Sequence, residues 1–274
     1  MKHFNVYITL IIVLLTTALV AAPCWGRVNV DIAISTQAGW FSQAAADREM
    51  NEVVANVEKK VDDIKLFPPA NQDELADWVE KHTSNNQLDV LILCGQFPST
   101  IYQAGNAELD GSLAEEFLEA GNMIVNTGDY MFYVVNGAGT NGEGGLQNMM
   151  DIATTMWDDD TPVGVTDDGK KYLPTLRDFQ TDRPFHLNEL RDPWETEIIF
   201  AGGEIRADPV VVHDTDTDGR LAIFYQTSGQ DGDPRGEVIS EFILNWLPEI
   251  AGGGFSVEPK GKLGDLWGRL KVSN

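Results

Sequence analysis

The run from Asp214 to Gly219, in which aspartate alternates with threonine, is the most specific chemical pattern in the sequence. Carboxylates at alternate positions, followed by a glycine that permits a tight reversal, begin calcium loops of the EF-hand kind. The twelfth position counted from Asp214 is Tyr225, where such a loop needs glutamate, and the following residues are typical of a strand. Asp214, Asp216 and Asp218 are therefore calcium candidates only with help from a distant carboxylate, and the alternative is a solvated hairpin turn.

Cys94, at the end of an apolar run, is a candidate nucleophile. A reactive thiolate needs a cationic or histidine partner that lowers its pKa. The next four residues supply none, and beyond the first 26 residues the histidines are His82, His186 and His213. We expect a buried cysteine that packs as a small apolar side chain. The alternative requires folding to bring His213 or His186 to it.

A second candidate site is the polar turn from Thr127 to Tyr130, which follows an apolar run ending near Asn126. A sharp turn after a central strand presents its side chains at the sheet edge where ligands bind. Thr127 is a poor nucleophile without a positioned base, and a hydrolase built here would use Asp129 and His213. The alternative is a turn that serves only the fold.

Residues after neighbouring strands are expected to line a ligand cleft with this turn. The glycine-rich stretch 136–145 lacks the Gly-Lys-Ser/Thr ending of a phosphate loop and is interpreted as a flexible lid. The predicted cleft residues are Gly95, Gln96, Thr127, Gly128, Asp129, Tyr130, Ser228, Gln230 and Asp231.

Acidic loops at 157–160 and 230–235 are most simply solvated surface, although the second follows the last predicted strand and could form a wall of the cleft. Tryptophans beside such loops would suit a carbohydrate, since the apolar face of a sugar stacks on aromatic rings. Trp40, Trp157 and Trp194 are the candidates, with core packing as the alternative for each.

These residues must be positioned by strands and helices that alternate four times along the first part of the chain, a pattern typical of a doubly wound α/β fold. The apolar run Leu88–Cys94 indicates a strand buried on both faces. We therefore predict a mostly parallel sheet with helices on both faces. The predicted strands are 28–34, 63–67, 88–94, 122–126, 195–200, 210–212 and 220–225, and the predicted helices are 42–61, 73–81, 110–120, 145–157 and 237–246.

The rhythm changes between residues 158 and 208, where prolines are frequent and long periodic runs are few. This region is predicted to be a partly β insertion laid beside the sheet. The domain is expected to span 27–250, followed by a hinge and a short basic tail at 251–274.

Residues 1–26 have the layout of a signal peptide: Lys2 precedes an apolar stretch that Pro23 ends. A retained anchor helix is the alternative. Cleavage after Gly26 would leave Cys94 as the only thiol, so the mature domain would have no internal disulfide. We expect an exported protein, periplasmic or extracellular.

The composition combines an ordinary hydrophobic content of 43% with a formal net charge of -24. The apolar content suffices for a packed core. The charge argues against nucleic acid and against an anionic membrane surface as partners. No cofactor is expected, with calcium as the one candidate, and the oligomeric state is not indicated.

Three segments resemble the class I glutamine amidotransferase-like superfamily, in its flavodoxin-like layout, and most closely its ThuA-like branch. The segment 89–95 resembles the strand whose glycine loop forms the oxyanion side of such sites, and 121–129 resembles the strand that leads into the nucleophile elbow. The segment 219–225 with the helix ending at Leu247 resembles the closing strand and helix. Together these segments span most of 28–247.

The resemblance implies a cysteine at the elbow and a histidine near the last strand, and this chain has neither. Thr127 stands at the elbow, and the loop 226–230 contains no histidine. We therefore expect a non-catalytic binding or accessory module, with carbohydrate as a candidate ligand. The alternatives are a divergent hydrolase that uses Thr127, Asp129 and His213, and a purely structural interaction domain.

Overall fold

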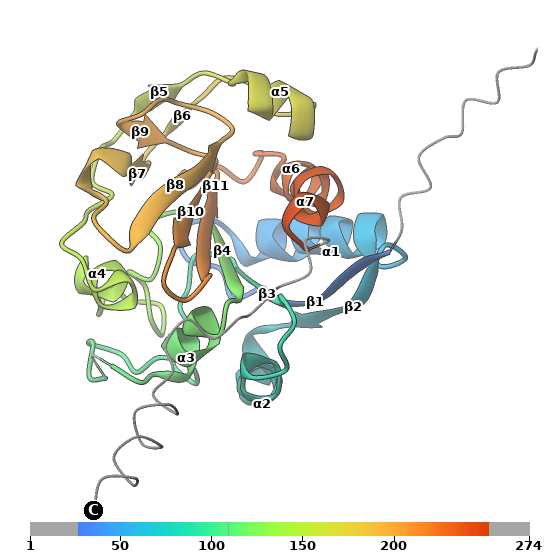
Figure 1. The fold of residues 1–274 in the computed structure, drawn as a ribbon, viewed down its shortest axis with the longest axis vertical. Coiled ribbons are helices and arrows are strands. Elements are labelled where there is room, and N and C mark those ends of the chain that lie inside the picture. Colours follow the sequence, from blue (N-terminus) through green and yellow to red (C-terminus); the bar gives the residue numbers. More distant parts are fainter. Residues whose placement is uncertain (1–26, 109, 252–274) are drawn as a thin grey trace, which may run out of the picture.

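The computed structural model describes residues 27–108 and 110–251, which fold around a seven-stranded sheet (Figure 1). The strand order is β2-β1-β3-β4-β11-β10-β8. The strands are β1 (Val28–Ser35), β2 (Val61–Phe67), β3 (Val90–Leu93), β4 (Met123–Thr127), β8 (Trp194–Ile199), β10 (Val210–Asp214) and β11 (Arg220–Phe224). The signal-peptide and tail predictions lie outside the described residues.

The first five strands of this order are parallel, and β10 pairs antiparallel with both β11 and β8. All residues of β3, β4 and β11 are buried, which matches the apolar runs that predicted them. The predicted α/β fold with a mostly parallel sheet is confirmed.

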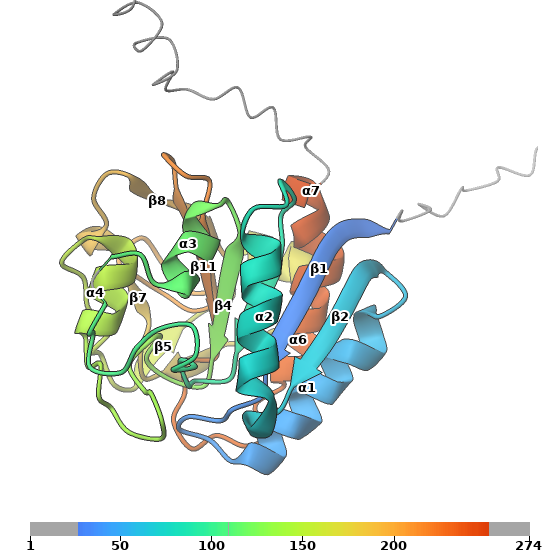
Figure 2. The same ribbon diagram turned by 90° about the horizontal axis from the view of Figure 1, so that it is seen from below.

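Helices cover both faces of the sheet (Figure 2). Their bounds are α1 (Gln43–Val57), α2 (Gln72–Thr83), α3 (Leu113–Glu119), α4 (Gly144–Met150), α5 (Asp167–Tyr172), α6 (Arg235–Glu241) and α7 (Leu247–Ala251), with 3-10 turns η1 (Pro69–Asn71) and η2 (Leu187–Glu189) and a π-helical segment η3 (Phe242–Trp246). Helices α1 and α6 pack together on one face, and α2 and α3 on the other.

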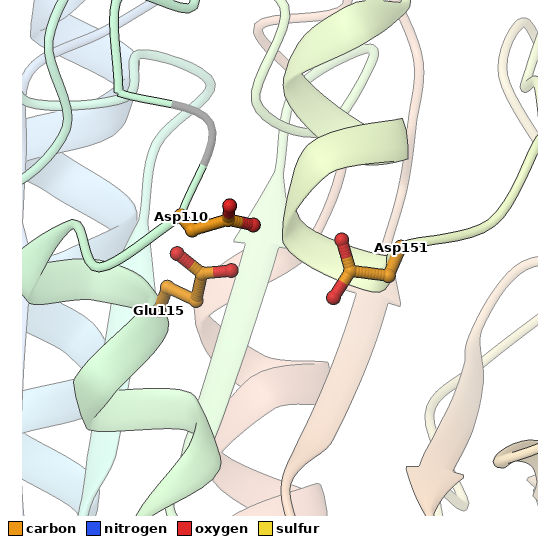
Figure 3. Close-up of side chains that lie close together, drawn as sticks. All are labelled: Asp110, Glu115 and Asp151. Carbon is orange, nitrogen blue, oxygen red and sulfur yellow. The ribbon is translucent and has the colours of Figure 1, made fainter.

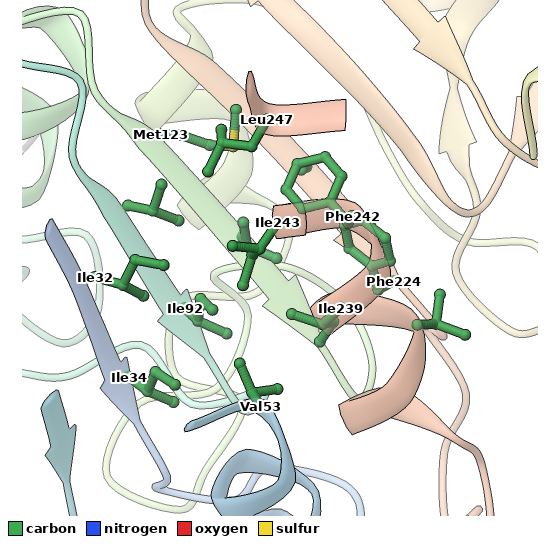
Figure 4. Close-up of a cluster of buried hydrophobic side chains, with 14 of the residues drawn as sticks. Ile32, Ile34, Val53, Ile92, Met123, Phe224, Ile239, Phe242, Ile243 and Leu247 are labelled. Atoms are coloured by element: carbon green, nitrogen blue, oxygen red, sulfur yellow. The ribbon is translucent and has the colours of Figure 1, made fainter. Parts of the chain in front are cut away.

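The core is divided by the sheet into two layers, because alternate residues of each strand point to opposite faces. Ile92 in β3 packs in the layer under α1 and η3, whereas its neighbours Leu91 and Leu93 pack in the layer under α2 and α3. Figure 4 shows the first layer, in which Ile239 and Phe242 lie over the strands. This double burial fixes the position of each strand end, and hence of the residues that follow it.

Three predicted helices are shorter in the structure. Helix α1 ends at Val57, four residues before the predicted end, because Val61 already begins β2. Helix α3 begins after Ser112, whose hydroxyl accepts from the Glu115 amide as an N-cap. Helix α4 ends at Met150, because Asp151 takes a left-handed conformation with φ of 52°. The residues that follow, up to Trp157, therefore form an irregular segment instead of the predicted helix.

The region 158–208 is partly β, as expected, but it is not wholly beside the sheet. Its strand β8 forms an edge of the main sheet by pairing with β10. Two small antiparallel pairs lie outside that sheet, β5 (Thr161–Val163) with β6 (Phe179–Thr181) and β7 (Phe185–His186) with β9 (Arg206–Ala207). The expected strand was thus correctly located in the sequence, but its partner was set by tertiary pairing.

Across 27–108 and 110–251, no helix has the length and apolar character needed to cross a membrane.

Candidate ligand-binding site

Most of the predicted cleft residues meet at one edge of the sheet, where β3, β4 and β11 end. The register pairs Leu93 with Asn126 and Thr127 with Phe224, so the loops after the three strands are neighbours. The Gly128 amide donates to the Tyr225 carbonyl over 3.2 Å. The Ser228 amide, further along the loop after β11, donates to Asp182 Oδ2 over 2.8 Å.

The centre of this edge is filled by Arg235, a residue that the sequence reasoning missed. Its side chain is fully buried, and Nε donates to Thr127 Oγ1 over 3.1 Å. Nη2 donates to Thr227 Oγ1 over 2.6 Å and also lies 3.1 Å from Asp233 Oδ2. The only sequence signal was an isolated arginine within an acidic loop, at the start of the closing helix.

The Arg235 guanidinium also lies over the Phe41 ring, with 4.5 Å between its carbon and the ring centroid. Phe41 in turn packs against Gly128, whose φ is +117° and where a Cβ would lie 2.6 Å from the ring. Gly128 thus serves close packing at the elbow as well as its turn. The hydroxyl of Thr127, at the nucleophile position, is engaged by Arg235.

Cys94 is fully buried, and burial raises the pKa of its thiol to about 12. No histidine accompanies it. His186 faces Glu189 and Asp158, and His82 faces Asp31. His213 contacts Glu195 and Asp218, and its partner across the ladder is Arg220, four residues before Phe224.

Arg220 pairs with Met123 at the start of β4, whereas Thr127 ends that strand. His213 therefore lies at the opposite edge from Thr127 and Asp129. The structure does not bring together the histidine and the elbow that the hydrolase hypothesis requires.

Asp129 is the most perturbed titratable group of the turn. Its side chain is 7% exposed, and burial raises its carboxyl pKa to about 6. The Tyr130 amide donates to it, and Arg183 Nε lies 3.5 Å from Oδ1, too far for a hydrogen bond. A carboxyl group with this pKa can hold or release a proton near neutral pH.

A buried polar network holds the turn that carries Asp129. The Asn126 side chain donates to the Asp129 carbonyl over 2.8 Å and to Gln226 Oε1 over 2.9 Å. The Gln226 backbone amide donates to Asp208 Oδ2 over 2.7 Å. Burial raises the pKa of Asp208 to about 6, and its Oδ1 has no hydrogen-bond partner. These hydrogen bonds hold the backbone of the turn after β4 in place.

Beside Asp129, the Arg183 guanidinium stacks on the exposed Trp157, 4.4 Å from the ring centroid. Trp157 also packs edge-on against Tyr130 and Tyr133, with centroid separations of 5.2 and 5.4 Å. Its ring is supported from the elbow, yet the residue is 43% exposed. An exposed, braced indole beside a carboxyl and a guanidinium is an arrangement suited to a sugar.

The other two tryptophan candidates differ in their exposure. Trp194 is 5% exposed and its indole N–H donates to the Met150 carbonyl, so it belongs to the core. Trp40 is 47% exposed and precedes Phe41 in the loop after β1. Its carbonyl accepts from the Gly229 amide over 2.7 Å, which attaches that loop to the loop after β11.

The remaining cleft candidates, Gly95, Gln96, Gln230 and Asp231, serve contacts between loops. Gly95 approaches Gly39 so closely that a Cβ on it would lie 3.2 Å from the Gly39 Cα. Gln96 bridges the Ala38 carbonyl and the Gly137 amide. The Gln230 carbonyl accepts from Arg235, and Asp231 accepts from the Ser42 amide.

The 214–219 turn has its own internal partners. Asp214 Oδ1 accepts from the amides of Asp216 and Thr217, over 2.8 and 3.3 Å, and Asp218 contacts His213. Strands β10 and β11 pair antiparallel on either side, so the segment is a hairpin turn. Calcium binding at Asp214, Asp216 and Asp218 stays a prediction.

A different acidic group comes together elsewhere in the described residues. Single carboxylate oxygens of Asp110, Glu115 and Asp151 all lie within 4.8 Å of one another (Figure 3). Burial raises the pKa values of Glu115 and Asp151. Glu115 Oε2 accepts from the Gly111 amide over 2.6 Å, so part of its hydrogen-bonding capacity is used by the loop.

No protein-family model matches the sequence, and no curated protein matches it.

Proposed function

We propose that this chain is an exported binding or accessory module on an amidotransferase-like scaffold, and that its ligand is a carbohydrate bound at Trp157 beside Asp129. The observation that carries the proposal is the exposed Trp157 ring, braced by Tyr130 and Tyr133 at the edge where β4 ends. Braced aromatic rings offer the apolar face of a sugar a large contact area with little loss of side-chain entropy.

A binding role accords better with the elbow than the chemistry of the resembling superfamily does. The Thr127 hydroxyl accepts from a fully buried arginine, and the Cys94 thiol has a pKa of about 12. Neither group has a neighbouring imidazole that would take its proton. The module would therefore hold its ligand without forming a covalent intermediate.

The divergent hydrolase remains the second candidate because of one observation, the raised pKa of Asp129. A carboxyl with a pKa of about 6 suits general acid or base catalysis near neutral pH. Without His213 at this edge, such an enzyme would depend on Asp129 and on loop carboxylates such as Asp159 and Asp182.

The test is a titration of the purified full-length protein with neutral mono- and oligosaccharides, followed by calorimetry and tryptophan fluorescence. We expect binding accompanied by a change in fluorescence, weakened at least about tenfold in Trp157→Ala because the stacking surface is lost. Trp40→Ala is the matched control, since it removes a similarly exposed indole that, among the described residues, does not stack with Arg183, Tyr130 or Tyr133. Sugar binding that survives Trp157→Ala unchanged would contradict the proposed site.

The same samples separate the two candidates. The binding module leaves the saccharides intact, whereas the hydrolase releases reducing ends with a rate that falls in Asp129→Asn. Turnover that depends on Asp129 would replace the binding proposal with the hydrolase.

A further inference from the structure

The acidic segment 157–160 is held against the protein by basic groups from the 158–208 region. Arg183 Nη1 contacts Asp159, and Arg206 Nε donates to Asp158 Oδ2 over 2.5 Å. His186 Nε2 lies 3.8 Å from the same Asp158 oxygen. Two arginines and an imidazole thus converge on two neighbouring carboxylates, next to the exposed Trp157.

These basic groups are not fully used by the protein itself. Arg183 Nε and His186 Nε2 are both buried without a hydrogen-bond partner, and each faces a carboxylate only at longer range, Asp129 Oδ1 at 3.5 Å and Asp158 Oδ2 at 3.8 Å. The His186 side chain is 4% exposed, and its Nδ1 is already engaged by Glu189 Oε1 at 3.1 Å. That contact leaves Nε2 directed at the Asp158 and Arg206 pair. A buried polar atom without a partner is rare in native proteins and marks a place where a ligand atom would be stabilised.

The carboxylates that now occupy the basic groups are easy to replace. The side chain of Asp159 is 73% exposed and that of Asp158 41%, whereas those of Arg183 and Arg206 are 13% and 25% exposed. Ion pairs to exposed carboxylates contribute little, because water solvates the free carboxylate almost as well. An incoming carboxylate could therefore exchange with Asp159 at small loss, and it would meet the planar fork of Arg183.

A cluster of basic groups is unusual in so acidic a protein. The whole chain contains 19 lysines and arginines against 43 acidic residues, so its long-range field repels anions. Local contacts therefore have to overcome that field, and the semi-buried Arg183 and Arg206, with Arg183 Nε still lacking a hydrogen-bond partner, are the contacts that would do so.

We propose that the sugar bound at Trp157 carries a carboxylate, as a uronic acid does, and that this group takes the place of the Asp159 carboxylate on Arg183, with Arg206 and His186 completing the site. This inference rests on the proposed carbohydrate function. In the unliganded protein the segment 157–160 then acts as an internal stand-in for the acidic ligand.

The experiment uses pairs of sugars that differ only in oxidation at C6, glucuronate with glucose and galacturonate with galactose, and acetate as a carboxylate without a sugar. Binding to the purified full-length protein is followed by calorimetry at constant ionic strength. We expect each uronate to bind at least about tenfold more tightly than its neutral partner and than acetate. Arg183→Gln should abolish this preference, and Arg177→Gln, which removes an exposed arginine elsewhere, should leave it unchanged.

Asp159→Asn should change the affinity for uronates in the opposite direction. Removing the competing carboxylate should tighten uronate binding severalfold and leave the affinity for the neutral sugar unchanged, a result that a merely unfolded variant cannot give. Arg206→Lys keeps the charge and removes the planar fork, so it should weaken the preference without abolishing it.

The outcomes also separate this inference from the proposed function. Equal binding of uronates and neutral sugars, or tighter binding of the neutral sugars, overturns the carboxylate inference and leaves the carbohydrate proposal intact. Binding of acetate as tight as that of the uronates, lost in Arg183→Gln, supports the carboxylate position and overturns the sugar proposal. No binding of any probe overturns both.

Discussion

Arg235 and Arg183 both lie at the edge where β4 and β11 end, and they differ in how completely the protein satisfies them. Arg235 is fully buried, and its three nitrogens donate to the hydroxyls of Thr127 and Thr227 and to neighbouring carbonyls. Arg183 leaves Nε without a partner, and its firmest contact is the largely exposed Asp159.

The difference separates an arginine that maintains the fold from one that is available to a ligand. All three guanidinium nitrogens of Arg235 are engaged inside the protein, and one of them occupies the Thr127 hydroxyl at the elbow. The proposed binding site therefore lies at the adjacent Asp129 and Arg183, where Nε has no hydrogen-bond partner. The elbow position alone is therefore not a guide to function in this chain.

The largest expected effect is on Arg235. Arg235→Met would remove the partner of the Thr127 hydroxyl and one partner of the bonded pair Thr227 and Asp233, and we expect the free energy of unfolding to fall by about 3 to 5 kcal/mol. Arg183→Met, the matched change on the other side of the comparison, should lower it by about 1 to 2 kcal/mol, because the pair with Asp159 is exposed and the buried Asp129, 3.5 Å from Nε, can take up a proton when Arg183 is removed. Urea unfolding measures both, and equal losses would contradict the distinction.

Asp208 tests the buried polar network with Gln226 that holds the turn next to Arg183. Burial raises its folded-state pKa to about 6 from 3.8, so the folded protein binds this proton more tightly than the unfolded chain. Its contribution to stability is therefore full below about pH 4 and is lost as the pH rises through about 6. Asp208→Asn should remove that part of the fall and stabilise the protein by up to about 3 kcal/mol at pH 7.

The measurement is urea unfolding of both proteins between pH 4 and pH 7. Asp168→Asn, which neutralises an exposed aspartate, controls for the general relief of the acidic surface. A pH profile of Asp208→Asn that parallels that of the unsubstituted protein would show that Asp208 is not the titrating group.

We expect Cys94, like Arg235, to serve only the fold. Cys94→Ser exchanges a buried thiol for a hydroxyl, and we expect a loss of about 1 kcal/mol in stability with no change in ligand affinity. The raised pKa predicts negligible alkylation of the native protein by iodoacetamide at pH 8, since the thiol stays protonated. Rapid labelling, or lost binding with intact folding, would restore Cys94 as a functional residue.

The smallest expected effect concerns calcium at the 214–219 turn, a region satisfied by its own partners. Because Asp214 already accepts two turn amides, calcium should shift the melting temperature only slightly, and magnesium should do the same by general screening. A large calcium-specific shift that disappears in Asp216→Ala would contradict this expectation. A shift that disappears only in Asp151→Asn would assign the ion to Asp110, Glu115 and Asp151.

The strands, their burial and the fold class could be predicted from the sequence. Leu88–Cys94 is apolar throughout because β3 is covered on both faces, and that requirement leaves a local pattern that needs no tertiary knowledge. The turn from Thr127 to Tyr130 was likewise placed correctly at a strand end, since parallel strands deliver their ends to one edge.

The residues that decide what this edge can do could not be predicted in the same way. Arg235 meets Thr127 across 108 positions of sequence, and His213 is separated from the elbow because β10 runs antiparallel and places it at the far edge. Arg183 reaches Trp157 only because the 158–208 region folds back beside the elbow. Periodicity records which face of an element is buried, whereas the meeting of side chains depends on how strands pair and how loops cross. The sequence by itself therefore determined the scaffold, and tertiary pairing decided which polar groups are engaged and which remain free to bind.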